Sequence, residues 1–473
     1  MRRPRITLLD AMADANLFAP WFRDPTSWAA WRAFLKSLFA LPMNDAEFAT
    51  YQECTGRTEL PSAPASEAWL VCGRRSGKSF VLALVAVFLA CFHDFSRYLT
   101  RGERATVMIV AADRKQSRVI LRYIHGLLTG VPMLKRMIER ETAEAFDLSN
   151  KITIEVATAS FKTVRGYTIC AGLLDELAFW PTDDTSSNPD DEIITAIRPG
   201  MATIPNAMLL CASSPYSRKG ALWDAHRKHF AQNNDPILVW QAPTLTMNPT
   251  VPQSVIDEAM ERDPVSAAAE FGAQFRRDIE SFVLREAVAA CVSSGVFERG
   301  PQRNISYVGF ADPSGGSADS MTLAIGHKDY IRKTVVVDAL REARPPFSPE
   351  IVADKFARLL KTYRVIKITG DRYAGEWPRE QFSKFGIRYE ATTKSKSVMY
   401  VDLLPLINSR RIDLLDHTKL VNQLCSLERR TARGGRDSID HPPQGHDDLI
   451  NAVAGLASAV TKYSAYNLAA LAS

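Results

Sequence analysis

Apolar residues recur along the chain in short runs, each followed by a turn and an amphipathic stretch. This pattern begins near residue 66 and predicts buried strands that alternate with helices. We expect strands at 68–72, 105–112, 151–159, 170–176 and 207–214, and helices at 78–93 and 114–128. Strands that alternate with helices are typical of a mainly parallel sheet covered on both faces. Aromatic residues at spacings of three and four predict an earlier helix at 20–45.

The pattern changes after the apolar run 236–243. Residues 244–300 are polar and predict charged helices, so we expect a helical linker subdomain there. A second strand-rich part then opens with predicted strands at 305–313 and 365–371, a helix near 349–363 and a closing helix at 447–460. The predicted domains are residues 1–243, 244–300 and 301–473.

Composition excludes several classes of protein. The 473 residues are 46% hydrophobic and 23% charged, which is ordinary for a globular protein and excludes a disordered or fibrous one. The net charge of +5 allows a local basic groove but does not by itself indicate a nucleic-acid-binding protein. The seven cysteines form no CxxC pair, which favours buried thiols over disulfides or zinc. The chain start shows no signal-peptide core, and its longest apolar stretch, 80–92, is shorter than the ~20 residues that span a bilayer, so we expect a soluble cytosolic protein.

The turn CGRRSGKS, after the first predicted strand, carries phosphate-binding chemistry. A glycine-rich turn between a strand and a helix directs backbone N–H groups at an anion. Lys78 adds a positive charge for the terminal phosphates, and the Ser79 hydroxyl can bind Mg²⁺. The strict Walker A pattern requires glycine at position 72, where this chain has Cys72, so the match is relaxed and a plain strand–helix turn is the alternative. The candidate nucleotide-binding residues of this turn are Gly73, Arg74, Arg75, Ser76, Gly77, Lys78 and Ser79.

Two later strands end in residues that would complete an ATP site. The run CAGLLDE ends in Asp175, expected to hold the Mg²⁺ shell, and Glu176, expected to polarise the attacking water. The run AMLLCASS ends in Ser213 and Ser214, which could sense the γ-phosphate. The order of these features favours an ATP site over a chance match.

Three arginines are candidates for stabilising the charge that builds up on the transferred phosphoryl group. Arg74 and Arg75 lie inside the glycine-rich turn, and Arg165 precedes the Asp175 strand. Each could equally be a surface charge or a salt-bridge partner, and for Arg75 that interpretation is favoured.

Acidic residues at the ends of elements predict a second site. Asp312 and Asp371 each end a predicted strand, and Asp447 and Asp448 open the last helix. Hydrolysis of a phosphodiester by two metal ions requires carboxylates from separate elements to converge. This order of acids is expected of a ribonuclease H-like nuclease, although each Asp alone could be a helix cap or strand terminator. Because it lies nearer the apolar stripe of the helix, Asp448 is the preferred ligand, with Asp447 as second ligand or cap.

An arginine- and glycine-rich segment, ERRTARGGR, lies shortly before these aspartates. Its cations could neutralise DNA phosphates next to the metal site, and a flexible solvated loop is the alternative. The candidate DNA-binding residues are Arg429, Arg430, Arg433 and Arg436.

These motifs together resemble the large terminase subunit, the DNA-packaging motor of tailed bacteriophages. The most specific segments are CGRRSGKS, LLDELAFW, ADPSGG, TGDRYAGEW and SIDHPPQGHDDLINA, and the resemblance extends from about residue 50 to 460. It implies an α/β fold class: a P-loop ATPase domain with a mainly parallel sheet, followed by a ribonuclease H-like α/β nuclease domain. By the resemblance, Arg165 stands where some relatives supply an arginine finger, and Asp371 stands where some relatives have Glu.

The resemblance also implies cofactors and partners. ATP with Mg²⁺ is expected at the first site and two Mg²⁺ or Mn²⁺ at the second. The implied partners are double-stranded DNA, the portal protein of the procapsid, the small terminase subunit and further copies in a pentameric ring, with a monomer in solution. The implied location is the host cytoplasm and transiently the portal, with no membrane.

Two other functions stay open. The first is a helicase-like ATPase whose C-terminal domain binds nucleic acid without cutting it. The second is a non-enzymatic assembly protein with degenerate sites, against which Lys78, Glu176 and the three ordered aspartates argue.

Overall fold

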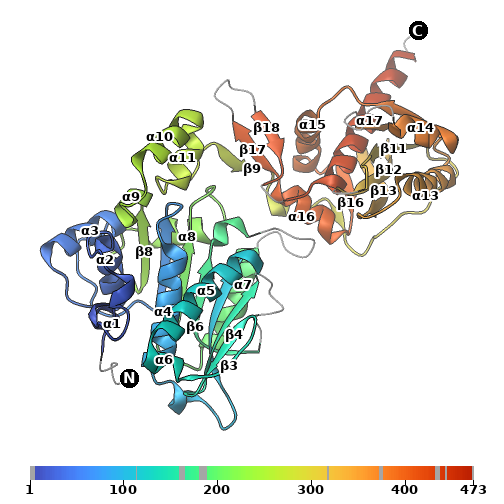
Figure 1. Cartoon of the computed structure of the whole chain (residues 1–473). Helices are drawn as coiled ribbons and strands as arrows, with labels where there is room; N and C mark the ends of the chain where they lie inside the picture. The colour runs from blue at the N-terminus through green and yellow to red at the C-terminus, as the bar shows by residue number, and fades with distance from the viewer. Residues whose placement is uncertain are drawn as a thin grey trace. The chain divides into compact units, whose positions relative to one another are not determined.

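Each strand-rich part of the sequence forms a sheet of its own in a computed structural model of the chain (Figure 1). Contacts divide the chain into unit 1, Met1–Pro181 with Asn188–Arg277, and unit 2, Thr182–Ser187 with Asp278–Ser473. The segment 244–300, expected as a linker subdomain, is divided between them at residues 277 and 278. The structure describes residues 6–112, 114–158, 164, 166–180, 189–316, 319–371, 377–431, 437–442 and 445–470, the side chains of 114, 158, 189 and 462–470 excepted.

Unit 1 contains an eight-stranded sheet in the order β3-β4-β5-β2-β6-β7-β1-β8. Neighbouring strands from β5 to β8 are parallel, whereas β3 and β4 add an antiparallel edge that the sequence pattern did not predict. The edge strands are short and partly polar, so they show little of the apolar pattern of the central strands. The strands are β1 (Glu67–Cys72), β2 (Ala105–Ala111), β3 (Ile138–Glu141), β4 (Ala145–Leu148), β5 (Ile152–Thr158), β6 (Thr168–Asp175), β7 (Met208–Ser213) and β8 (Ile237–Ala242).

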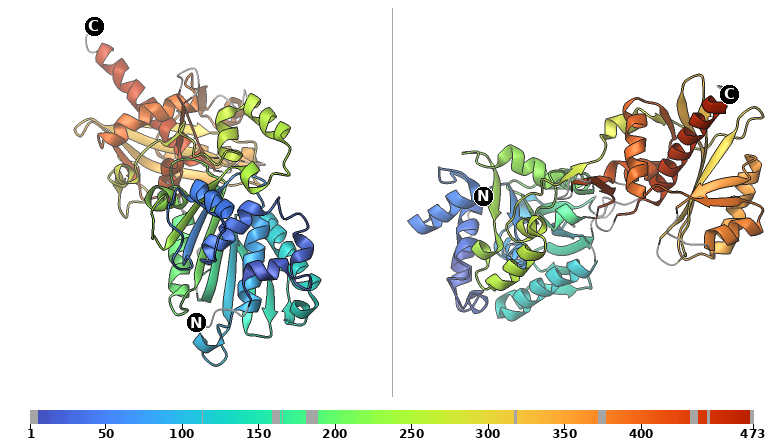
Figure 2. Two further views of the ribbon diagram at one scale, coloured as in Figure 1. Left: turned by 90° about the vertical axis from the view of Figure 1, so that its left-hand side faces the viewer. Right: turned by 90° about the horizontal axis from the view of Figure 1, so that it is seen from above.

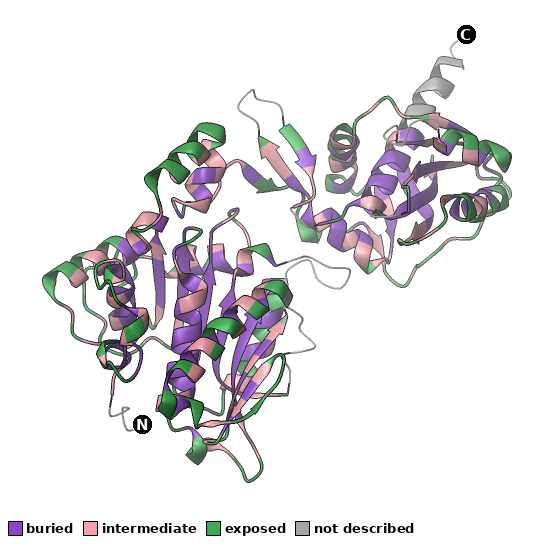
Figure 3. Ribbon diagram, viewed as in Figure 1, coloured by how far each residue is buried: buried purple, intermediate pink, exposed green. Residues whose placement is uncertain are grey.

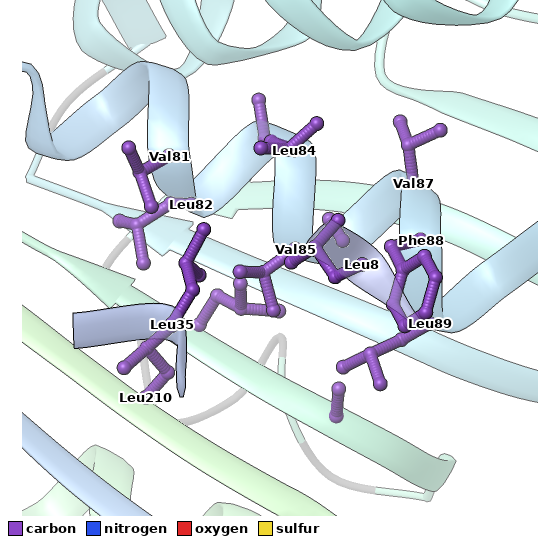
Figure 4. Close-up of a cluster of buried hydrophobic side chains, with 14 of the residues drawn as sticks. Leu8, Leu35, Val81, Leu82, Leu84, Val85, Val87, Phe88, Leu89 and Leu210 are labelled. Carbon is purple, nitrogen blue, oxygen red and sulfur yellow. The ribbon is translucent and has the colours of Figure 1, made fainter. Parts of the chain in front are cut away.

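Helices cover both faces of this sheet because successive strand residues point to opposite sides. Leu70 packs in one buried cluster with α1, α2 and α4–α6, and its neighbours Trp69 and Val71 pack in another with α7 and α8. Figure 4 shows part of the first cluster, in which buried side chains of α4 lie near Leu8, Leu35 and Leu210. The helices are α1 (Leu8–Ala13), α2 (Ala29–Leu38), α3 (Asp45–Thr55), α4 (Lys78–Phe92), α5 (Arg114–Gly130), α6 (Pro132–Lys135), α7 (Pro189–Met201), α8 (Ala221–His229), α9 (Thr244–Met247), α10 (Gln253–Arg262) and α11 (Pro264–Glu270), with short 3₁₀ turns at Ala19–Trp21, Ser96–Tyr98 and Leu177–Phe179.

The helix predicted at 20–45 is shorter in the structure. It forms α2 alone, and α3 begins as a separate helix after a break. Pro42 lies in the break, and a residue before proline is disfavoured in helical conformation. Asn44 then caps α3 in a capping box with Glu47, which fixes the start of the new helix.

Unit 2 contains a seven-stranded sheet in the order β10-β16-β13-β12-β11-β14-β15. Strands β11, β12 and β13 form an antiparallel meander, and β14 and β15 continue parallel to β11. The strands are β10 (Val292–Ser293), β11 (Tyr307–Asp312), β12 (Met321–Asp329), β13 (Thr334–Ala343), β14 (Lys367–Gly370), β15 (Arg388–Ala391) and β16 (Ile412–Leu415). This topology agrees with the predicted ribonuclease H-like domain, so the predicted fold class is confirmed for both units.

Two layers of helices enclose the sheet of unit 2 (Figure 2). Phe310 packs with α12 and α15–α17, and Ala311 packs on the other face with α13 and α14. Gly455 allows α17 to approach β11 closely, because a Cβ there would lie 2.4 Å from the Phe310 ring. The central strands of both sheets are buried and the outer helix faces are exposed (Figure 3). The helices are α12 (Arg285–Ala289), α13 (Pro349–Thr362), α14 (Trp377–Lys384), α15 (Lys396–Asn408), α16 (Thr418–Ser426) and α17 (Asp448–Ala470).

Unit 2 also contains a small three-stranded sheet, which the sequence analysis did not predict. Strand β17 (Glu428–Thr431) pairs antiparallel with β18 (Asp437–Asp440) and with β9 (Ile279–Ser281). The described part of the arginine-rich segment, residues 428–431, therefore lies in one strand of a β-hairpin. In the part of the chain that the structure describes, we find no helix with the length and apolarity needed to cross a membrane.

Candidate functional site

The glycine-rich turn joins the end of β1 to the start of α4. Gly77 has φ +100°, a conformation that side chains other than glycine rarely adopt, and it lets α4 begin directly at Lys78. Arg75 also has positive φ, at +66°. The helix N-terminus and its preceding turn thus occupy the carboxyl edge of the parallel sheet, the place where such folds bind phosphate.

Lys78 lies at the centre of the first site, and it is 5% exposed. Its ammonium donates to the carbonyl oxygens of Cys72 and Gly73 and to Oγ of Ser214, each at 3.1 Å. It also forms an ion pair with Oε1 of Glu176 at 3.3 Å. The predicted phosphate-binding lysine and the predicted catalytic base are therefore adjacent.

Asp175 ends β6 beside the turn and is 2% exposed. Its Oδ2 accepts a hydrogen bond from Oγ of Ser79 at 2.7 Å, so the two predicted Mg²⁺ contacts are in place together. Burial, together with the charge of Glu176, raises the pKa of Asp175 to about 7. Its Oδ1 is buried and has no hydrogen-bond partner among the described residues. A buried carboxylate oxygen without a donor fits the binding of hydrated Mg²⁺.

Glu176 leaves the strand in a left-handed conformation, with φ +50°. Its Oε2 accepts from the backbone N–H of Ser214 at 3.1 Å and from Oγ of Ser213 at 3.3 Å. Strand β7, which ends in these serines, lies between β6 and β1 in the sheet. The two serines proposed to couple ATP state to motion therefore contact the proposed base directly.

Three side chains outside the turn hold its backbone. Nε1 of Trp31 donates to the carbonyl of Ser76 at 2.9 Å, in a buried hydrogen bond. Thr244 donates to the carbonyl of Arg74 and Asn248 to that of Arg75, each at 2.8 Å. We call these three the loop clamp. Sequence reasoning missed it, because an aromatic residue in an amphipathic helix predicts only core packing.

Arg74 and Arg75 lie apart from the buried centre of this site. The Arg74 side chain is 64% exposed and lies 3.4 Å from Glu270 of α11. Arg75 is exposed as well. Arg165 lies outside the described residues.

Strands β11 and β14 bring Asp312 and Asp371 to one edge of the unit 2 sheet. The strands are parallel neighbours, and the N–H of Asp371 donates to the carbonyl of Ala311 at 3.2 Å. Nδ2 of Asn451, on α17, lies 2.7 Å from Oδ2 of Asp312 and 3.4 Å from Oδ2 of Asp371. Sequence reasoning missed Asn451; its place one turn after Asp447 and Asp448 was the available signal.

The carboxylates of this edge influence one another. Burial is the main cause that raises the pKa of Asp312 to about 8, and the charges of Asp371, Asp448 and Asp447 act in the same direction. Burial, with the charge of Asp447, raises the pKa of Asp448 to about 6. Such shifts indicate negative charges gathered in a poorly hydrated place.

The two adjacent aspartates at the start of α17 have different surroundings. Asp447 is 6% exposed, and its Oδ2 accepts from the Tyr400 hydroxyl at 2.8 Å and forms an ion pair with Lys396 at 2.9 Å. Asp448 is half-buried at the first position of α17, where its carbonyl accepts from Oγ1 of Thr322 at 2.8 Å. The charge of Asp447 is thus balanced by a lysine.

The described residues contain no group of three or more His, Cys, Asp or Glu side chains arranged to hold a metal ion. Asp312 and Asp371 converge on the Asn451 amide. Oδ1 of Asn451 is buried without a partner among these residues. Buried carboxylate and amide oxygens are ligands that Mg²⁺ and Mn²⁺ accept, so the donors fit such an ion.

The predicted DNA-binding arginines are partly described. Arg429 lies 3.6 Å from Asp437, and Arg430 lies 3.3 Å from Glu428, with side chains about one-third exposed (35% and 32%). Arg433 and Arg436 lie outside the described residues.

Comparisons with known proteins give structural similarities only. No family model and no curated protein matches the chain. The chain is similar to the large terminase of bacteriophage HK97 (15% identity, 91% of this chain and 99% of that one, TM-score 0.39). It is also similar to the large terminase of a thermophilic bacteriophage (10% identity, 89% and 99%, TM-score 0.37) and to the large terminase nuclease of thermophilic phage G20c with bound magnesium (17% identity, 34% and 84%, TM-score 0.30).

Similarity at this level does not describe individual side chains, and function depends on the sites themselves. Two of these three solved structures are large terminases, and the third is a large terminase nuclease.

Proposed function

We propose that this chain is the large subunit of a viral DNA-packaging terminase, an ATP-driven motor for double-stranded DNA that also cuts the DNA with metal ions. One observation carries the proposal: a single chain places Lys78, Asp175 and Glu176 together in unit 1 and Asp312 and Asp371 together in unit 2. The residues of the first set are of the kinds that ATP hydrolysis requires, and those of the second set are of the kind that metal-dependent phosphodiester hydrolysis requires.

The first site would bind ATP with Mg²⁺. The turn before α4 offers backbone N–H groups and a helix N-terminus to the phosphates, and Lys78 offers its charge. Ser79 and Asp175 would hold the Mg²⁺, whose charge, when it is bound, stabilises the transferred phosphoryl group. Glu176 would orient and deprotonate the attacking water, a role for which its contact with Lys78 and Ser214 positions it.

The second site would cut the DNA. Asp312, Asp371 and Asp448 would hold two Mg²⁺ or Mn²⁺, which supply charge stabilisation and an activated water when bound. Asn451 orients the first two carboxylates toward each other. Arg429 and Arg430 would contact DNA phosphates, with Arg433 and Arg436 on the same segment.

The proposed setting follows the family resemblance. The chain would assemble as a pentameric ring on the portal protein of a procapsid, with the small terminase subunit as partner, and be a monomer in the host cytoplasm before docking. Glu176 touches Ser213 and Ser214, so loss of the γ-phosphate would be transmitted along β7 to the rest of unit 1.

Two assays test the proposal with the purified full chain. DNA-stimulated phosphate release should be lost in Lys78→Ala, and equal turnover in this variant and the parent would contradict the ATP site. Mn²⁺-dependent cleavage of plasmid DNA should be lost in Asp312→Asn. Cleavage that persists in this variant, or a parent that never cuts, would instead favour the helicase-like alternative.

A further inference from the structure

Asp447 is paired with a protein cation. Its Oδ2 lies 2.9 Å from Nζ of Lys396 and accepts from the hydroxyl of Tyr400, a fully buried side chain. By contrast, the hydrogen bond that the Asp312 carboxylate receives from the described residues comes from the neutral amide of Asn451. A carboxylate that has both a lysine and a hydroxyl needs no metal ion to balance its charge.

Lys396 has a second partner. Its ammonium lies 2.8 Å from Oδ1 of Asp440, the last residue of β18. The next residue, Ser397, accepts from the N–H of Ile439 at 2.9 Å. The start of α15 is therefore fixed to the hairpin β17–β18 on one side and, through Asp447, to the start of α17 on the other.

This arrangement connects two parts of the proposed nuclease. The hairpin carries Arg429 and Arg430, two of the candidate DNA-binding residues, and α17 carries Asp448 and Asn451. Lys396 is the cation common to both connections, because it pairs with Asp440 and Asp447 at once. The Lys396 side chain is 31% exposed, and two carboxylates together restrict it more than a single surface partner would.

We propose that Lys396 and Asp447 form a positioning ion pair, which sets α17 against the hairpin so that Asp448 and Asn451 face Asp312 and Asp371. Asp447 is then a positioning residue and not a metal ligand. This inference rests on the proposed nuclease function and adds a role for residues around its metal site.

Binding of Mn²⁺ alone, measured by calorimetry on the full chain without nucleotide, tests the assignment. Asp447→Asn should bind the same number of Mn²⁺ ions as the parent, whereas Asp448→Asn should bind fewer. Lys396→Met should weaken Mn²⁺ binding about 10–100-fold, because residues that orient metal ligands have effects of this size. The number of bound Mn²⁺ ions should not change. Lys396→Arg keeps the charge and should restore most of the affinity.

Lys394→Met is the matched control. This lysine pairs with Asp402 at 2.6 Å and donates to Ser458, so it also contacts α15 and α17, but among the described contacts it touches neither Asp440 nor Asp447. It should bind Mn²⁺ like the parent. If Lys396→Met does not fold, the double variant Lys396→Met/Asp447→Asn replaces it, because it leaves no unpaired buried charge at position 447. This double variant should bind the same number of Mn²⁺ ions as the parent.

Two results would overturn the assignment. The first is a loss of bound Mn²⁺ in Asp447→Asn as large as in Asp448→Asn, which would make Asp447 a ligand. The second is a Lys396→Met variant that binds Mn²⁺ as tightly as Lys394→Met. If the expected binding pattern is found but the parent never cuts DNA, the ion pair is supported and the proposed nuclease function fails.

Discussion

The amide nitrogen of Asn451 lies 2.7 Å from a carboxylate oxygen of Asp312, and the same nitrogen reaches Asp371 at 3.4 Å. A neutral donor thus stands between two acids of adjacent strands. Without it, Asp312 and Asp371 would lose the donor that they share. Asn451 therefore sets the geometry of this edge of the sheet.

Replacing Asn451 should weaken the metal site without affecting ATP hydrolysis. Asn451→Ala removes the donor shared by Asp312 and Asp371, and we expect Mn²⁺-dependent cleavage of plasmid DNA to fall about 10–100-fold. Phosphate release by the same preparation serves as the internal control, since unit 1 is unchanged. Cleavage at the parental rate would show that the amide does not orient the two carboxylates.

Proton and metal should compete at Asp312. Its pKa is raised from 3.8 to about 8, so the folded chain keeps a proton that the unfolded chain releases near its ordinary pKa. Without metal, this group therefore favours folding at low pH, and its contribution is lost as the pH rises from about 4 to about 8. Added Mg²⁺ should then raise the melting temperature more at about pH 8.5 than at about pH 6.

Differential scanning calorimetry with Mg²⁺ or with chelator measures this effect. Asp312→Asn, which has no proton to exchange, should show a smaller Mg²⁺ shift with weaker dependence on pH. An equal Mg²⁺ shift at both pH values in the parent would be inconsistent with competition at this carboxylate.

Glu176→Gln should separate nucleotide binding from hydrolysis. The amide keeps the shape of the side chain but cannot accept the proton of the attacking water, so turnover should fall about 10²–10⁴-fold. Binding of a fluorescent ATP analogue should persist, because Lys78 and Ser79 are unchanged. Glu139→Gln, on the distant edge strand β3, is the matched control and should hydrolyse ATP normally; loss of analogue binding in Glu176→Gln would argue against a purely catalytic role.

Trp31→Phe tests the loop clamp. The change leaves the buried carbonyl of Ser76 without its donor and should lower the free energy of unfolding of unit 1 by about 1–3 kcal/mol. It should also weaken ATP binding, because the turn is held less firmly. Urea unfolding followed by fluorescence measures the first effect, with Trp28→Phe as the comparison, since the described contacts of Trp28 are with aromatic rings. If both changes lowered the free energy of unfolding equally, the Trp31 hydrogen bond would have no special role in stability.

Gly455→Ala should disturb the packing of α17 on β11. Its new Cβ would lie 2.4 Å from the Phe310 ring, and overpacking of this kind costs about 1–3 kcal/mol. Hydrogen exchange in α17 should accelerate. A Gly455→Ala variant as stable as the parent would mean that α17 can move outward without a loss of stability.

Gly126→Ala, in α5, is the opposite case. Nothing lies within 4 Å of its added Cβ, and the better helix propensity of alanine should stabilise the chain by up to about 1 kcal/mol.

Local patterns in the sequence predicted much of the fold. Seven strands of the two sheets were recognised because they are apolar over enough residues: β1, β2, β5, β6, β7, β11 and β14. The helices that follow the turn at Lys78 and precede β14 were recognised from their apolar or amphipathic pattern. The acids at positions 175, 312 and 371 were found for the same reason, since each ends such a run. The residue that ends a strand can be identified from the sequence wherever the strand itself can be recognised.

The remaining features depend on contacts between distant segments. Asn451 is an unremarkable helix residue until β11 and β14 become neighbours beside α17. Trp31 donates to a carbonyl 45 positions away in the chain, which no periodicity reveals. The hairpin β17–β18 consists of short polar strands whose pairing with β9 supplies the order that their own sequence lacks. The division of residues 244–300 at 277 and 278 likewise depends on which sheet each half packs against.

The loop clamp has a consequence for nucleotide affinity. Three carbonyls in a row, those of residues 74, 75 and 76, are already held by side chains from α2, from α9 and from the residue that follows α9. A turn fixed in this way is preorganised, so little entropy would be lost in ordering the turn when ATP binds. Under the proposed function, helices α2 and α9 would contribute to the nucleotide site, and a fragment trimmed to the sheet and its flanking helices alone should bind ATP poorly.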